Sequence, residues 1–171
     1  MNRTELTFMP EFFDRYINLT DENTSLNQLL ASTKYQFRNV ENELHKLEDF
    51  RYEEGKWTPK ELLQHVIDTE RIMAYRALCI ARGEKQSLNG FDEQEYANAS
   101  FGSNRTIESL LIEFEVVRDA SIILFESLDK SVLHNNGISN NLEITPLALG
   151  FVIVGHAMHH RNVFDKRYVG D

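Results

Sequence analysis

Three histidines lie close together near the end of the sequence, in the segment GHAMHHRNVF, residues 155–164. The ten residues before this segment are almost all apolar, so a helix through it would place several imidazoles beside a hydrophobic core. His156 and His160 are four residues apart, which on an α-helix separates their side chains by about 40° and lets both rings project from one face. His159 lies about 60° to the other side of His156. His156 and His160 are therefore the candidate chelating pair.

A further histidine, His65, lies much earlier in the sequence. Its neighbours include Leu62, Val66 and Thr69, positions that a helical bundle would turn inward. Its ring could therefore meet the pair from the last helix. Zinc and similar divalent metals bind neutral imidazole nitrogens, and a site with three protein ligands keeps positions open for water or substrate. Histidines at helical spacing also occur as hydrogen-bonded core or surface side chains, so spacing alone leaves both interpretations open.

Three neutral imidazoles would leave a bound metal its full positive charge. A water molecule or a thiol on that metal would then lose its proton more easily and become a nucleophile near neutral pH. A metal-activated thiolate could attack an electrophilic carbon and transfer its sulfur, whereas hydroxide could attack an acyl centre and hydrolyse it. The same site permits both reactions.

Acidic residues near His65 are candidates for supporting roles. Asp68 lies three residues further along, on the same side of the helix, and is the candidate catalytic base or imidazole-orienting group. Asp68 or Asp92 could also occupy a fourth coordination position and close the site. Glu70 lies five residues after His65 and points away from it, so it is predicted to be a surface side chain.

Helix-start signals show which elements must position these residues. Thr58 can cap a helix, Pro59 fits the first helical position, and Glu61 can complete a capping box with Thr58. A second Thr-Pro pair, Thr145 and Pro146, begins the apolar helix that carries the three histidines. Apolar residues at spacings of three and four predict two further amphipathic helices. The four predicted helices cover residues 25–48, 58–82, 106–128 and 145 to about 166.

No segment alternates with the two-residue period of a strand, and no repeat of 20 to 50 residues occurs. The sequence therefore predicts an all-α protein, a four-helix bundle formed by residues 1–171 as a single domain. A short helical turn is predicted within residues 10–17. A long loop, residues 83–104, joins the second and third helices, and long loops in compact domains often carry function.

Composition narrows the partners. The formal net charge is -9, and no basic cluster is present that could neutralise a run of phosphates, so nucleic acid is not an expected partner. The longest apolar run, residues 147–154, is far shorter than a membrane span, and the first residues show no signal-peptide pattern. We expect a cytoplasmic, soluble protein that does not bind membranes. The single cysteine, Cys79, excludes a disulfide framework.

Three segments together resemble the DinB/YfiT-like family. They are WTPKELLQHVIDTE, the loop that begins GFDEQEYA, and the late GHAMHHRNVFDKRYV. The most specific feature is their order, in which a lone histidine follows a Trp-Thr helix start and a His-x-x-x-His pair comes much later. The similarity extends over essentially the whole chain.

The resemblance implies a DinB-like four-helix bundle with up-down-down-up helix order, often a homodimer. It also implies a three-histidine site for a divalent metal, zinc or nickel before others, at His65, His156 and His160. Relatives include thiol S-transferases and an isomerase that use bacillithiol or mycothiol, and metal-dependent hydrolases. Asn162 and Val163 depart from the family's commonest late motif, which puts the substrate in doubt while leaving the ligands in place.

Two classes of function follow. The first is a metalloenzyme acting on a small-molecule substrate, a thiol S-transferase that uses a low-molecular-weight thiol ahead of a hydrolase. The second is a non-catalytic stress-response bundle whose histidines hold a structural metal or none. An open coordination position would favour the first class, and a closed one the second.

Overall fold

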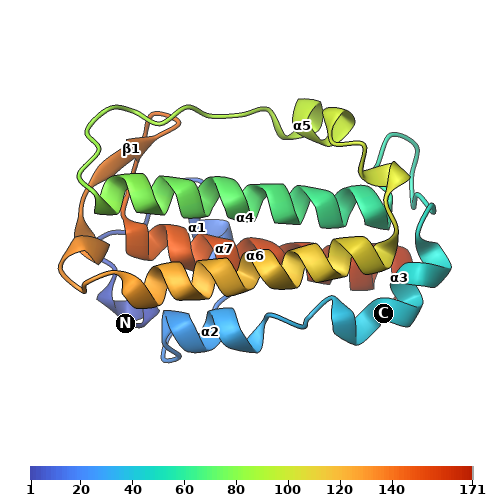
Figure 1. Cartoon of the computed structure of the whole chain (residues 1–171), viewed down its shortest axis with the longest axis horizontal. Coiled ribbons are helices and arrows are strands. Elements are labelled where there is room, and N and C mark those ends of the chain that lie inside the picture. Colours follow the sequence, from blue (N-terminus) through green and yellow to red (C-terminus); the bar gives the residue numbers. More distant parts are fainter. Residues whose placement is uncertain (171) are drawn as a thin grey trace.

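Four helical segments lie side by side along one long axis (Figure 1). The computed structural model describes residues 1–170. α4 and α6 run in the same direction, whereas α7 and the first segment, formed by α2 and α3, run in the opposite direction. This is the predicted up-down-down-up order. The main helices are α2 (Leu26–Ser32), α3 (Glu41–Leu47), α4 (Pro59–Ala81), α6 (Ile107–Ser127) and α7 (Pro146–Val163).

The long helices begin where the capping signals predict. The Thr58 hydroxyl accepts a hydrogen bond from the Glu61 N–H, and the Thr58 N–H donates to the Glu61 carboxylate at 2.8 Å, which completes the capping box of α4. The Thr145 hydroxyl caps α7 by accepting a hydrogen bond from the Ala148 N–H, without a reciprocal bond. α7 then continues beyond the predicted end as a π-helical turn, Phe164–Val169.

The first predicted helix, residues 25–48, is wrong as a continuous element. The chain leaves the α-helix after Ser32 and resumes at Glu41, with a 3₁₀ turn at Arg38–Val40 between. Arginines from other helices hydrogen-bond to the carbonyl groups freed by this break: Arg118 donates to the carbonyl of Leu30, and Arg161 donates to that of Gln36. The break thus depends on partners far away in the sequence.

A small sheet was not predicted. β1 (Gly137–Ser139) and β2 (Leu142–Ile144) form an antiparallel hairpin, and Leu88 makes a parallel bridge to Ser139. Asn140 and Asn141 have φ of 51° and 62°, which is the left-handed conformation that two-residue hairpin turns require. Each strand has three residues, too few for a two-residue alternation to be recognised in the sequence.

The long connection between α4 and α6 crosses the outer face of α4 (Figure 1). It contains a helix, α5 (Glu93–Ala99), and a 3₁₀ turn at Gly102–Asn104, where the sequence predicted only a loop. Asp92 caps α5 by accepting a hydrogen bond from the Glu95 N–H at 2.8 Å. The segment is therefore ordered by its own hydrogen bonds.

The short helical turn predicted near the N-terminus is present as α1 (Asp14–Ile17), which packs against α7. The backbones approach so closely that a Cβ atom at position 155 would overlap the carbonyl oxygen of Tyr16, so Gly155 is required there. This contact places Tyr16 over the part of α7 that carries the histidines. Among residues 1–170, no helix is long and apolar enough to cross a membrane.

Candidate metal centre

The three predicted histidines meet in the interior between α4 and α7. Nε2 of His156 lies 3.1 Å from Nε2 of His65 and 3.2 Å from Nε2 of His160. His65 and His156 are each 4% exposed, and His160 is partly covered. The antiparallel packing of α4 and α7 therefore brings together residues that are 91 positions apart.

The donor set suits a cation better than it suits hydrogen bonding. A neutral imidazole carries one N–H and one lone pair, so Nε2 of His156 cannot form good hydrogen bonds with both neighbouring nitrogens at once. A divalent ion bound at 2.0–2.1 Å in tetrahedral geometry holds its nitrogen ligands about 3.3 Å apart, close to the separations that His156 makes here. Both separations from His156 thus match those of ligands of one metal, and all three ligand nitrogens lie within 4.8 Å of one another.

Burial keeps these imidazoles neutral. Loss of solvation lowers the pKa of His65 to about 4, with a smaller contribution from His159. Burial also lowers the pKa of His156 and His160 well below the usual range, and neighbouring histidines add to the effect. The lone pairs are therefore free for a metal near neutral pH, because protonated imidazole does not coordinate.

Aromatic side chains hold the rings in place. The Trp57 indole packs on His65 with ring centroids 4.6 Å apart, and the Tyr16 ring meets the edges of His156 and His159 at 5.2 and 5.5 Å. Sequence reasoning missed Tyr16, since the short turn that carries it has no spacing relation to α7. Gly155, adjacent to His156, is the one signal that another backbone comes close.

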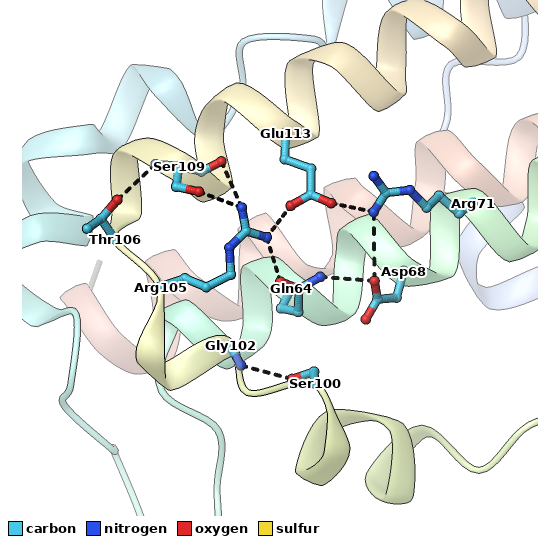
Figure 2. Close-up of polar contacts among 9 residues, drawn as sticks. All are labelled: Gln64, Asp68, Arg71, Ser100, Gly102, Arg105, Thr106, Ser109 and Glu113. Atoms are coloured by element: carbon cyan, nitrogen blue, oxygen red, sulfur yellow. Dashed lines mark hydrogen bonds and ion pairs between the residues drawn. The ribbon is translucent and has the colours of Figure 1, made fainter.

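Asp68 has its contacts elsewhere. Its carboxylate accepts a hydrogen bond from the Gln64 amide at 2.9 Å and lies 4.0 Å from Arg71 (Figure 2). Gln64 and Arg71 in turn contact Arg105 and Glu113, which tie α4 to the start of α6. Burial raises the pKa of Asp68.

Within the described chain, the group of side chains that could hold a metal consists of His65, His156 and His160 and includes no carboxylate. Asp92, the other acidic residue considered for a fourth position, is the cap of α5. Among residues 1–170, no hydrogen bond or ion pair joins Asp68 or Asp92 to the histidines, so a catalytic role for Asp68 stays a prediction.

Glu70 is not the surface residue that the sequence suggested. It is 2% exposed and forms two hydrogen bonds of 2.8 Å with the guanidinium of Arg118 on α6, which is fully buried. The prediction failed because α4 packs against α6 as well as against α7. A side chain that points away from His65 on this helix still enters the core.

A cavity of about 310 Å³ adjoins the histidine cluster, a volume within the range of small-molecule sites. His160 forms part of its wall, so a ligand in the cavity would reach one edge of the cluster. The wall also includes Tyr52, Lys56 and Trp57 from the loop before α4. Gln94 of α5 and Tyr168 of the π-helical turn after α7 contribute as well.

Comparisons with known proteins agree with this fold. YfiT from Bacillus subtilis, described as a probable metal-dependent hydrolase with an unusual four-helix bundle topology, has a similar structure, with a TM-score of 0.65 and 16% sequence identity over 93% of this chain and 85% of YfiT. No curated protein sequence matches significantly. The sequence profile of the DinB superfamily matches residues 22–164, which is most of the chain. This protein belongs to the DinB superfamily.

Proposed function

We propose that the protein binds a divalent metal ion, zinc or nickel, through His65, His156 and His160, and that it transfers a thiol sulfur to small electrophilic molecules. The observation that carries this proposal is the convergence of three neutral imidazole nitrogens beside a cavity of substrate size. The metal would supply positive charge that favours ionisation of a thiol near neutral pH.

The side chains around the cluster would orient the ligands and the substrate. Trp57 and Tyr16 fix the imidazole rings of His65 and His156 by edge and face contacts. Lys56 and Gln94 line the cavity, and an ammonium and an amide group are suited to bind polar groups of a low-molecular-weight thiol. The aromatic wall formed with Tyr52 and Tyr168 would hold an apolar electrophile.

The composition of the candidate ligand group favours S-transfer over hydrolysis. Hydrolysis of an acyl group benefits from a base that takes the proton of water and returns it to the leaving group. The metal-capable group in residues 1–170 contains no carboxylate, and Asp68 is hydrogen-bonded to Gln64. Thiol transfer needs less: the sulfur forms a bond to carbon, the leaving group departs with its electron pair, and the thiol proton passes to solvent.

Hydrolysis is the second candidate, and the structural likeness to YfiT favours it, because that protein is described as a probable metal-dependent hydrolase. Water is small enough to reach the cluster through the same cavity. The homodimer and the cytoplasmic location stay predictions, which sedimentation equilibrium and cell fractionation would test.

The first experiment is to measure the metal content of untagged protein by mass spectrometry. We expect close to one equivalent of a divalent metal in the wild type and its loss in His156→Ala/His160→Ala. His45→Ala is the matched control, because His45 is exposed on α3 and contacts only Glu41 among the ionic groups of residues 1–170. A wild type that stays without metal after reconstitution would overturn the proposal.

The reaction itself is tested with the metal-loaded protein. Bacillithiol, mycothiol or cysteine is mixed with 1-chloro-2,4-dinitrobenzene, and chloride release and thioether formation are followed. We expect turnover that the His156→Ala/His160→Ala variant lacks. Metal binding without thiol transfer but with ester hydrolysis would select the hydrolase, and metal binding with neither activity would select a non-catalytic bundle.

A further inference from the structure

A second cavity, of about 460 Å³, lies on the outer face of α4 under the connection that leads to α5. It lies far from the histidine cluster, because Arg76 in its wall is eleven residues after His65, or about 16 Å along the helix. The wall of this cavity includes one basic, one acidic and several apolar or aromatic residues: Ile72, Tyr75, Arg76, Glu84, Phe91 and Tyr96.

Arg76 is buried, and its hydrogen-bond partners are neutral groups. Its side chain is 3% exposed, and the guanidinium donates to two neutral acceptors, the carbonyl oxygen of Asn89 at 2.7 Å and the sulfur of Met73 at 3.6 Å. Within residues 1–170 it forms no ion pair. Burial lowers the pKa of Arg76, which reflects the cost of holding this charge out of water.

The other buried basic side chains of the described chain are paired. Arg118 forms two hydrogen bonds with the carboxylate of Glu70, and Lys60 lies 3.1 and 3.4 Å from Asp49 and Glu48. A buried charge without a partner destabilises a protein by several kcal/mol, so such groups are normally paired. Arg76 is therefore the exception that calls for an anion from outside the chain.

The acidic residue of the cavity wall, Glu84, does not supply that partner within the described residues. One carboxylate oxygen of Glu84 accepts hydrogen bonds from the backbone N–H groups of Lys85 and Gln86, both at 2.8 Å. These bonds lower the pKa of Glu84 and keep it ionised. A fixed negative charge in the wall also disfavours ligands that carry more than one negative charge.

We propose that this cavity binds a small carboxylic acid with an apolar body, whose carboxylate pairs with the guanidinium of Arg76. Arg76 is the only basic residue in the described wall, which suits a single carboxylate better than a phosphate dianion. Phe91 lies next to the guanidinium, 5.7 Å from ring centroid to Cζ, and packs against Tyr96 at 4.9 Å. These rings, with Ile72 and Tyr75, form the apolar surface for the body of the ligand.

Benzoate and benzamide form the test pair, because they share shape and apolar area and differ in charge. Each is titrated into the full-length protein at constant ionic strength while the melting temperature and the ¹H–¹⁵N spectrum are recorded. We expect benzoate to raise the melting temperature in a saturable way and to shift the amide signals of residues 86–91, and benzamide to do neither. Inorganic phosphate is expected to have a smaller effect than benzoate.

Arg76→Gln removes the charge and keeps an N–H donor for the Asn89 carbonyl, so we expect it to abolish the benzoate shift. Arg82→Gln is the matched control at the C-terminal cap of α4, since Arg82 is exposed, and it is expected to retain the shift. The proposal is overturned by equal effects of benzoate and benzamide, by a stronger effect of phosphate, by no effect of benzoate, or by a shift that survives in Arg76→Gln. The wild-type comparison of the two ligands decides the matter even if Arg76→Gln does not fold.

Discussion

Two groups of buried polar side chains share α4, and they are built in opposite ways. Glu70 and Arg118 bring opposite charges and form two hydrogen bonds of 2.8 Å with each other. His65 and its two partners lie about 7.5 Å away along the helix and bring three neutral rings whose nitrogens face one another. The first group is complete within the chain, whereas the second leaves lone pairs without a proton or an ion to share.

The contrast distinguishes buried polar groups that stabilise the fold from buried polar groups that are suited to bind a ligand. A satisfied ion pair in a core specifies how α4 and α6 pack and asks for nothing else. A cluster of neutral imidazole nitrogens gains little stability from its own contacts, whereas a cation bound by those nitrogens would stabilise it. The guanidinium of Arg76, which has no ion-pair partner among residues 1–170, resembles the histidines in this respect, and the ligand proposed for it is an anion.

The largest effect is expected from breaking the ion pair. Glu70→Gln leaves the charge of Arg118 buried without a partner, and we expect the free energy of unfolding to fall by about 3–5 kcal/mol in urea titrations. Glu70→Leu/Arg118→Met should recover most of that loss, because neither charge remains. As a control, Asp119→Asn removes a partly exposed partner of Lys34 and should cost less than about 1 kcal/mol. A Glu70→Gln variant as stable as this control would contradict the comparison.

Zinc should raise the stability of only those proteins that retain the histidine cluster. With free zinc at about 100 times its dissociation constant, the wild type should gain about 2.7 kcal/mol of unfolding free energy, and a chelator should reverse the gain. Differential scanning calorimetry measures this as a rise in melting temperature. His156→Ala/His160→Ala should show no gain, whereas Glu70→Leu/Arg118→Met should keep it. Equal stabilisation of both variants would show that zinc binds elsewhere.

Acid should weaken the metal-free protein through the histidines. The pKa of His65 is lowered to about 4 in the folded state and lies near 6.5 in the unfolded chain, so the unfolded chain binds more protons between these values. Stability is then full above pH 6.5 and falls as the pH drops toward 4, by about 1.4 kcal/mol per unit for each histidine kept neutral. Urea titrations at several pH values measure the slope. It should be smaller in His65→Leu and unchanged in His45→Ala, and identical slopes in all three proteins would refute the assignment.

The smallest effect is expected from His156→Leu in metal-free protein. Leucine has a volume close to that of histidine and no polar atoms, so the change should alter the free energy of unfolding by no more than about 1 kcal/mol in either direction. The same urea titration on Glu70→Leu alone should show a far larger loss. A severe loss in His156→Leu would mean that the cluster is held together by its own hydrogen bonds.

Much of the fold could be predicted because its signals are local. Thr58, Glu61 and Thr145 cap their helices through hydrogen bonds that span three residues, so the sequence contains all the partners. The spacing of His156 and His160 fixed their shared direction for the same reason. The position of His65 on the inward face followed from the helical period of its apolar neighbours.

The errors share a long-range cause. The break between α2 and α3 is stabilised by Arg118 and Arg161, and the burial of Glu70 depends on the same Arg118 from α6. Tyr16 reaches the cluster only because α1 packs on Gly155. None of these partners is within one helical turn of the residue it affects, so no local pattern could reveal them.

The parallel direction of α4 and α6 has a consequence for the chemistry of the molecule. A 23-residue helix is about 34 Å long, and a chain that leaves its far end must return by that distance before it can start a helix in the same direction. This return segment supplies Glu84 and Phe91 to the cavity at Arg76 and Gln94 to the cavity at the histidines. A segment that the topology requires therefore lines both cavities, so a sequence change within it would alter the walls of both.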